Sequence, residues 1–367
     1  MSEPVLCANP RRQFVAQRED IESAISRVLN SDFYILGSEV DNFEKEFANY
    51  CGASTCIGVN SGTDALILSL HALGVGSGDE VITPSHTAVA SVAAIVSCGA
   101  KPIFVDVDPI SFTIDSSLIS KAVTSRTKAM LVVHLYGHPC DMNSIMEVAH
   151  KHNIYVIEDC AQAHGAEWNG RKVGTFGIVG CFSFYPTKNL GAIGDGGAVV
   201  TNDLVIADRI RSLRQYGWNS KRVSMEPSGV SRLDEIQAAI LRVKLPLLNV
   251  QNERRRRIAD VYREHLSQTN IVVPTEQPGS RHVYHLFVVR IKNRDTAILH
   301  LNSLGIFPGI HYSLPVHLHP SYTRFAPLDS GSLKATESLS KEILSLPMFP
   351  ELNDSEIERV CEGMLSV

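Results

Sequence analysis

The chain has 367 residues, 44% of them apolar, which is enough for one large domain, a smaller one and a sizeable buried core. A net charge of −5 with scattered signs disfavours nucleic acid or an anionic membrane surface as the main partner. No uncharged apolar stretch has the length of a membrane span or signal peptide, and the eight cysteines show no C-x-x-C pairing, so we expect a cytoplasmic protein with reduced thiols.

Short β-rich runs alternate with helical stretches from about residue 55 onward. Several runs are continuously apolar, as strands buried on both faces are. The helical stretches between them imply right-handed βαβ crossovers, so we predict an α/β fold with a mostly parallel central sheet flanked by helices. The runs expected as strands are residues 56–60, 80–85, 101–107, 128–137, 154–160, 181–185 and 197–203, with the first helices at 61–74 and 87–100.

The pattern changes after the segment SRLDEIQAAILRVKLPLL, residues 231–248. A long helical stretch is interrupted at Pro246 and continues through four consecutive arginines, 254–257, which we interpret as a solvated helix face. A strand over 282–291 and a helix over 295–305 follow. This mixture predicts a smaller α+β C-terminal domain, so we divide the chain into residues 1–249, with the N-terminal segment, and 250–367.

In an α/β sheet, ligands bind beyond the carboxyl ends of the strands, so polar residues at those positions are candidates for a site. The first group follows the strand that ends at Asn60. Gly62 lets the backbone approach a ligand, Ser61 and Thr63 supply hydroxyls, and a helix begins there whose N-terminus attracts anions. The group is either a phosphate site or a simple N-cap.

The second group is Glu158 and Asp159 at the end of an apolar strand, with Gln162 close behind. A carboxylate at this position is either an N-cap or the partner of a buried cation. A protonated pyridine nitrogen is such a cation, and an adjacent carboxylate favours its charged form.

The third group lies in the segment VGCFSFYPTKNLGAIGDGG, residues 179–197. Ser183 and Lys188 are five residues apart across a turn, so a hydroxyl can reach a phosphate while the lysine amine reaches an aldehyde on the same ring. A lysine in a partly dry site loses proton affinity and becomes a usable nucleophile. Taken alone, the segment also fits a surface turn.

The histidines at 311, 317 and 319 lack an accompanying acidic or cysteine ligand set, so we expect no metal site there.

These residues carry a family resemblance. The blocks SGTDAL, FVDVDP, VHLYGH, IEDCAQAHGA, CFSFYPTKNLGAIGDGGAVVTND and SRLDEIQAAIL resemble the DegT/DnrJ/EryC1/StrS family of sugar aminotransferases, in the family's order and over about residues 10–350. The resemblance implies the fold-type I aminotransferase architecture, pyridoxal 5'-phosphate as cofactor, and a homodimer with shared active sites. It also implies transfer of an amino group from L-glutamate to a nucleotide-linked keto-sugar.

The resemblance assigns roles residue by residue. Lys188 matches the lysine that binds the cofactor aldehyde, and one branch of the family that has His there performs dehydration instead. Asp159 matches the partner of the pyridine nitrogen and Gln162 the residue near the ring hydroxyl. The matches to the phosphate site are Gly62, Thr63 and Ser183.

Two positions depart from the family pattern. Where an aromatic residue often stacks on the ring, this chain reads Pro-Ser-His-Thr-Ala over residues 84–88, and either His86 supplies the flat face or it bonds to the backbone. The family's G-x-N-S-R block lacks its Asn near Val230 and Ser231, which removes an expected phosphate contact from the partner subunit; Asn219 is a possible substitute.

The sugar side is less well defined. The resemblance implies substrate contacts for His311 and Tyr312, with packing of the small domain as the alternative. Tyr185, which follows the strand end beside Ser183, is a further candidate. Lys221 lies in a loop after Trp218, and its charge suits a diphosphate contact across the dimer; a solvated side chain is the alternative. The chain is most similar to members that aminate C3 of a dTDP-linked 3-keto-6-deoxyhexose. The alternatives are a 4-keto sugar aminotransferase and a non-catalytic binding or regulatory protein.

Overall fold

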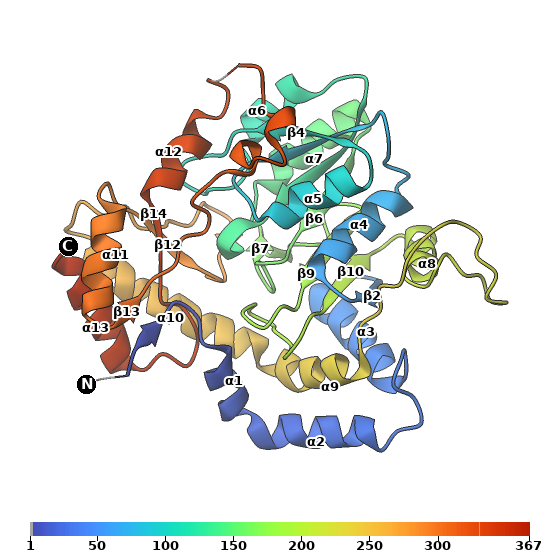
Figure 1. Ribbon diagram of the computed structural model, residues 1–367, viewed down its shortest axis with the longest axis horizontal. Coiled ribbons are helices and arrows are strands. Elements are labelled where there is room, and N and C mark those ends of the chain that lie inside the picture. Colours follow the sequence, from blue (N-terminus) through green and yellow to red (C-terminus); the bar gives the residue numbers. More distant parts are fainter. Residues whose placement is uncertain (1–2, 330) are drawn as a thin grey trace.

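The computed structural model describes residues 3–329 and 331–367. A seven-stranded sheet forms the centre of this part of the chain (Figure 1), in the order β2-β10-β9-β6-β5-β3-β4. Neighbours are parallel except in the two pairs that include β10, so the predicted α/β class with a mostly parallel sheet is confirmed. The strands are β2 (Thr55–Val59), β3 (Glu80–Pro84), β4 (Lys101–Val105), β5 (Thr127–Val133), β6 (Tyr155–Asp159), β9 (Val179–Ser183) and β10 (Gly197–Thr201).

Helices cover both faces of this sheet. Because successive strand residues point to opposite faces, Ile57 and Val59 lie in the core beneath one helical layer. Cys56 lies in the opposite core with Phe43 and Phe47. Every residue of β2, β3 and β10 is buried, which explains why their central residues are mostly apolar on both faces. One layer comprises α4 (Gly62–Ala72), α5 (Val89–Ser97) and α8 (Leu204–Leu213), and the other α3 (Ser38–Cys51), α6 (Ser116–Ala122) and α7 (Met142–His152).

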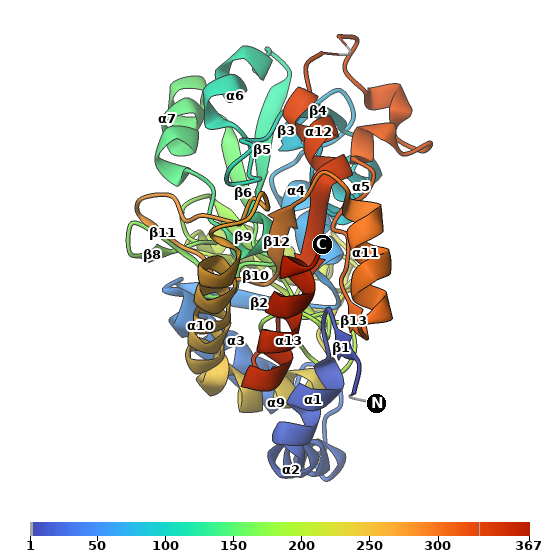
Figure 2. The same ribbon diagram turned by 90° about the vertical axis from the view of Figure 1, so that its left-hand side faces the viewer.

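The C-terminal elements form a separate core to one side of the sheet (Figure 2). The two strands β12 and β14 pair antiparallel beside three helices. Ile258, Val289, Leu301, Leu346 and Val360 are buried together there. The elements are α10 (Leu248–Leu266), β12 (Phe287–Arg290), α11 (Arg294–Ser303), β13 (Ile306–Phe307), α12 (Lys334–Glu342), β14 (Ile343–Leu346) and α13 (Asp354–Leu365).

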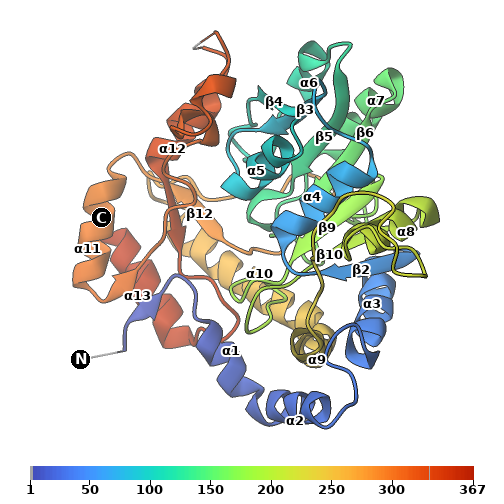
Figure 3. The same cartoon turned by 45° about the vertical axis from the view of Figure 1, so that its right-hand side comes forward.

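The N-terminal segment contacts both parts of the molecule. Its strand β1 (Val5–Leu6) pairs in parallel with β13, and Val5 lies in the C-terminal core. The helices α1 (Pro10–Ala16) and α2 (Arg18–Leu29) then lead away, and α2 lies along α9 (Glu235–Lys244), as Figures 1 and 3 show. The domain boundary predicted at residue 249 falls within α10 and stays a prediction.

Two predicted strands are shorter in the structure because each contains a tyrosine in the left-handed backbone region. Tyr284 has φ 42°, and the strand expected over 282–291 is reduced to β12. Tyr136 has φ 60° within a 3-10 turn over Leu135–Gly137, and the N–H groups of Val283 and Leu286 donate to the carbonyls of Gly137 and Tyr136. The strand expected over 128–137 correspondingly ends at Val133. A small sheet that sequence reasoning missed joins β11 (Ser280–Arg281), β7 (Glu167–Trp168) and β8 (Arg171–Lys172).

The arginine run is not a uniformly solvated face. Arg255 is only 4% exposed, and its Nη1 donates to the carbonyls of Tyr284, His285 and Met348. Our interpretation was therefore wrong for this arginine. Among the described residues, no helix combines the length and apolar character needed to cross a membrane.

Candidate active site

The three polar groups predicted from the sequence converge at the carboxyl ends of β2, β6 and β9. A pocket that is partly open to solvent lies there, with about 460 Å³ of empty space including its solvent-filled mouth. Six of the seven residues predicted to bind the cofactor line it: Gly62, Thr63, Asp159, Gln162, Ser183 and Lys188. Residues about 120 positions apart in the chain are thus brought into one cavity by the order of the strands.

Two glycines let the start of α4 contact the end of β9. The first residue of β10, Gly197, lies between these segments, and a Cβ there would be 2.4 Å from the carbonyl carbon of Ser61. A Cβ on Gly62 would lie 2.6 Å from the Cβ of Ser183. Ser61 caps the helix by accepting from the N–H of Asp64, so the unpaired N–H groups of the first turn remain close to the Ser183 hydroxyl. This arrangement suits an anion.

Lys188 follows β9 in the connection to β10. Its backbone N–H donates to the carbonyl of Tyr185 at 2.8 Å, which closes the turn and fixes the lysine relative to the strand end. Burial lowers the pKa of Lys188 to about 8, although nearby Asp159 acts in the opposite direction. At this pKa roughly a tenth of the amine is unprotonated at pH 7, far more than at the usual lysine pKa of 10.5, and the unprotonated amine is the form that a nucleophile or base requires.

The Asp159 carboxylate is held from two elements. Oδ1 accepts from the N–H of Ala161 at 3.1 Å, and Oδ2 accepts from the Ser91 hydroxyl of α5 at 2.8 Å. Burial raises the pKa of Asp159, and these two hydrogen bonds partly offset that effect. Only 5% of the residue is exposed, so a cationic ring nitrogen in the pocket would supply a charge partner that suits it.

Gln162 joins the pocket to the C-terminal loop. Its Oε1 accepts from the N–H of Tyr136 at 2.7 Å, which sets the orientation of the amide. Its Nε2 then donates to the hydroxyl of Tyr312 at 3.1 Å. Burial raises the pKa of Tyr312 to about 12, so this hydroxyl is neutral at physiological pH. One of the predicted substrate residues is therefore adjacent to the pocket.

His86 lies beside the pocket and does not line it. Its ring contacts Phe112 and Tyr136, and its Nε2 is 2.7 Å from the Tyr136 hydroxyl. Burial lowers the pKa of His86 to about 4. The lining residues at this position are Thr87 and Ala88, and ring stacking by His86 stays a prediction without support from this geometry.

The remaining predicted substrate residues differ in their surroundings. His311 is partly buried, with its Nδ1 2.8 Å from the Ser345 hydroxyl, and the charge of Lys188 adds to burial in lowering its pKa. Tyr185 is 52% exposed next to the pocket. Lys221 is exposed in the loop between α8 and α9, and among the described residues no side-chain bond connects it to the pocket. The diphosphate contact of Lys221 across a dimer stays a prediction.

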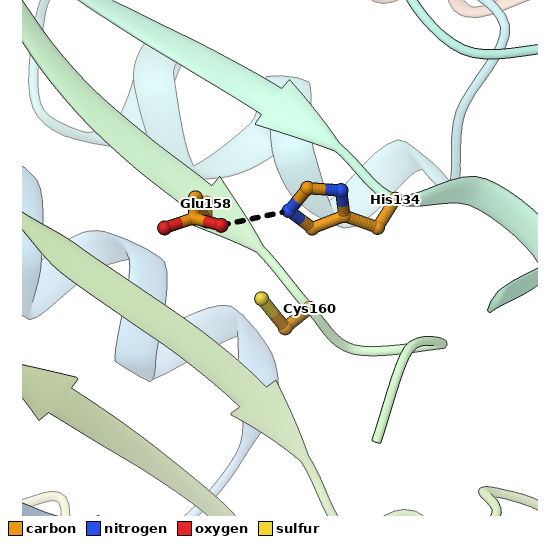
Figure 4. A group of neighbouring side chains, drawn as sticks. All are labelled: His134, Glu158 and Cys160. Atoms are coloured by element: carbon orange, nitrogen blue, oxygen red, sulfur yellow. Dashed lines mark hydrogen bonds and ion pairs between the residues drawn. The ribbon is translucent and has the colours of Figure 1, made fainter. Parts of the chain in front are cut away.

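Glu158, next to Asp159, belongs to a buried cluster with His134 and Cys160 (Figure 4) whose spacing would fit a metal ion. Its carboxylate already accepts four donors: the N–H groups of Gly174, Phe176 and Gly177, each at 2.7 Å, and His134 Nε2 at 3.0 Å. His134 Nδ1 in turn accepts from the Cys140 N–H. These bonds occupy the lone pairs of both groups, so we interpret the cluster as a clamp on residues 174–177.

The donor set of the pocket matches a phosphorylated pyridine aldehyde. An anion fits the start of α4 beside Ser183, a protonated ring nitrogen fits Asp159, and an aldehyde fits the amine of Lys188. The close approach of Gly62 to Ser183 leaves no space for a side chain, which is typical of a site where backbone N–H groups bind a phosphate.

Comparisons with known proteins agree with this chemistry. A sequence model of the DegT/DnrJ/EryC1/StrS aminotransferase family matches residues 15–365. The dTDP-3-amino-3,4,6-trideoxy-alpha-D-glucose transaminase of Streptomyces venezuelae is 48% identical over 349 residues, which cover 95% of this chain and 92% of the relative. The dTDP-3-amino-3,6-dideoxy-alpha-D-galactopyranose transaminase of Aneurinibacillus thermoaerophilus is also 48% identical, covering 95% of each. The crystal structure of S. venezuelae DesV superposes with a TM-score of 0.97 at 45% identity, covering 100% of this chain and 98% of that one.

Proposed function

Because this chain belongs to the DegT/DnrJ/EryC1/StrS aminotransferase family, we propose that it transfers an amino group from L-glutamate to C3 of a dTDP-linked 3-keto-6-deoxyhexose. The protein is an aminotransferase that depends on pyridoxal 5'-phosphate. The convergence of Lys188, Asp159 and the Gly62–Ser183 contact in one pocket is the observation that carries the proposal. The two relatives named above support the choice of C3 and of a dTDP-sugar.

The cofactor supplies an electron sink: its protonated ring accepts the electron pair left behind when a proton leaves the nitrogen-bearing carbon. Asp159 would hold the proton on the ring nitrogen. The N–H groups at the start of α4, Thr63 and Ser183 would hold the phosphate. Lys188 would bind the aldehyde at rest and, once released, its Nζ would remove the Cα proton of the amino donor in the first half-reaction. In the second half-reaction the same Nζ would deliver a proton to the carbon of the keto-sugar that receives the amino group.

We further propose that the protein is a homodimer with shared active sites. Exposed apolar residues, among them Ile35 and Ile193, lie on segments near the pocket that contact each other. Ile35 forms a β-bridge with Asp234, the residue before α9. The N–H of Ile193 donates to the side chain of Gln237 on α9. Tyr185 and Val230 are 52% and 42% exposed in the single chain. A second copy covering this surface would bring Lys221 or Asn219 toward a phosphate that Val230 cannot bind.

The proposal is tested in two stages. The absorption spectrum is recorded with pyridoxal phosphate, then with L-glutamate, for wild type and Lys188→Ala. A visible band that glutamate bleaches, absent from the variant, supports the donor half-reaction; no band in wild type would overturn the proposal.

The glutamate-treated protein is then offered dTDP-3-keto and dTDP-4-keto sugars, and products are identified by NMR. Amination at C4 would favour the runner-up. Bleaching without amination of either sugar would point to another acceptor. A band that glutamate does not bleach would favour a binding protein, and deoxygenation without glutamate consumption would indicate dehydration. Sedimentation velocity measures the oligomeric state, and a monomer would refute the shared site.

A further inference from the structure

A buried serine contacts Asp159 from the helix that follows β3. Ser91 lies in the first turn of α5, within the otherwise apolar sequence VASVAAIVS, and is 0% exposed. Its hydroxyl lies 2.8 Å from Asp159 Oδ2. A hydroxyl fully removed from water in an apolar helix is costly unless it is hydrogen-bonded, so its partner is informative.

The direction of each hydrogen bond in this group follows from the protons available. An ionised carboxylate only accepts, so Ser91 donates its single hydroxyl proton to Asp159. The hydroxyl of Thr87 lies 2.9 Å from the Ser91 oxygen and must then donate to it. Thr87 is itself 2% exposed and lines the pocket. Two hydrogen bonds therefore run in one direction: Thr87 donates to Ser91, and Ser91 donates to Asp159.

The two oxygens of Asp159 are therefore fixed from different directions. Oδ1 is bound by the N–H of Ala161, two residues along the same segment, and Oδ2 by Ser91 on α5. With Ser91 removed, one local hydrogen bond would remain, and the carboxylate could rotate about its Cβ–Cγ bond. A general base or charge partner has to be held in its productive orientation to be effective.

We propose that Ser91, supported by Thr87, is a positioning residue that fixes the plane of the Asp159 carboxylate and keeps it ionised for the cofactor's ring nitrogen. The inference rests on the proposed function, because that function defines the group Asp159 serves. Burial raises the pKa of Asp159, and the Ser91 hydrogen bond acts against this. Loss of the hydroxyl should weaken the negative charge facing the ring and hence the protonation of the ring nitrogen.

Ser91→Ala tests the inference on the cofactor-loaded protein. A hydrogen bond to a charged group corresponds to about one pKa unit. We expect the pH midpoint of the visible absorption band to rise by about one unit, because a less positive ring makes the nearby nitrogen of Lys188 more basic. We also expect kcat to fall about tenfold. Ser91→Thr keeps the hydroxyl and should restore the midpoint to within about 0.3 pH unit of wild type and kcat to within about twofold.

Ser69→Ala is the matched control. Ser69 is equally buried, on α4, and its hydroxyl donates to the Ala65 carbonyl and contacts Cys181, with no contact to Asp159. An unchanged midpoint in Ser91→Ala, an equal shift in Ser69→Ala, or no rescue by Ser91→Thr would overturn the inference.

If Ser91→Ala does not fold, Thr87→Val and Ser91→Cys replace it. Each should shift the midpoint in the same direction by a smaller amount, and a midpoint equal to that of wild type in both would refute the inference. Absence of the band from wild-type protein would instead indicate failure of the proposed function, so the two failures are distinguishable.

Discussion

Replacing Lys188 with methionine should stabilise the cofactor-free protein at neutral pH. Burial lowers the pKa of Lys188 from 10.5 to about 8, a difference equivalent to about 3 kcal/mol. Since the folded-state pKa is below the unfolded one, the unfolded chain binds more protons between pH 8 and 10.5, and stability from this group rises with pH in that window. The full free-energy cost of burying the protonated amine is present below pH 8 and is lost above about pH 10.5. Methionine has a similar length and carries no charge.

Urea unfolding of the cofactor-free wild type and of Lys188→Met is measured from pH 7 to 10.5. The difference between their free energies of unfolding isolates the contribution of Lys188, because all other groups titrate in nearly the same way in both proteins. We expect the advantage of the methionine variant to be about 3 kcal/mol larger at pH 7 than at pH 10.5. Lys151→Met, at an exposed position near the end of α7, is the control and should show no such trend. A difference that is independent of pH would show that Lys188 is not desolvated in the folded protein, and the argument for its reactivity would be lost.

Two further substitutions test the geometry around the pocket. Gly62→Ala places a Cβ 2.6 Å from the Cβ of Ser183 and should weaken pyridoxal phosphate binding about tenfold or more in a fluorescence titration. The control is Gly76→Ala, whose Cβ would have no atom nearer than 3.8 Å and which should leave the affinity unchanged. Equal affinities of the two variants would refute the close-contact argument. Glu158→Gln turns an amide NH₂ toward two of the groups that donate to the carboxylate, and it should lower the free energy of unfolding in urea by about 3 kcal/mol or more. The control is Glu147→Gln at an exposed position, which should show no change. A Glu158→Gln protein as stable as wild type would contradict the interpretation of the cluster as a clamp on residues 174–177.

The sequence predicts those parts of the site that follow from local pattern. Asp159 ends an apolar run, and Gly62 and Lys188 each come three residues after one, and in a parallel sheet such positions share one edge. Their convergence was therefore predictable, and it is confirmed by the pocket they line. The antiparallel direction of β10 was not predicted, because a glycine-rich connection between two apolar runs is compatible with either orientation.

Residues that depend on long-range partners could not be recognised from the sequence. Ser91 is a small residue in an apolar helix, and only the fold, which brings the first turn of α5 within hydrogen-bond distance of the end of β6, shows its bond to Asp159. Arg255 looks like its three neighbours, yet its helical phase buries it under Tyr284 and Met348. The contact between Gln162 and Tyr312 joins residues 150 positions apart. No sequence motif or periodicity indicates a single contact between residues that are far apart in the chain.

The placement of β2 has a consequence for biosynthesis. This strand is at the edge of the sheet, all its residues are buried in the finished fold, and its one neighbour in the sheet is β10, with Val59 opposite Gly197. During translation β2 therefore emerges well over a hundred residues before its partner, a delay on the order of ten seconds at typical elongation rates. Over that time an apolar strand with free N–H and C=O groups is available to other nascent chains. A ribosome-stalled chain ending near residue 190 should consequently depend on chaperones far more than one that includes residue 201.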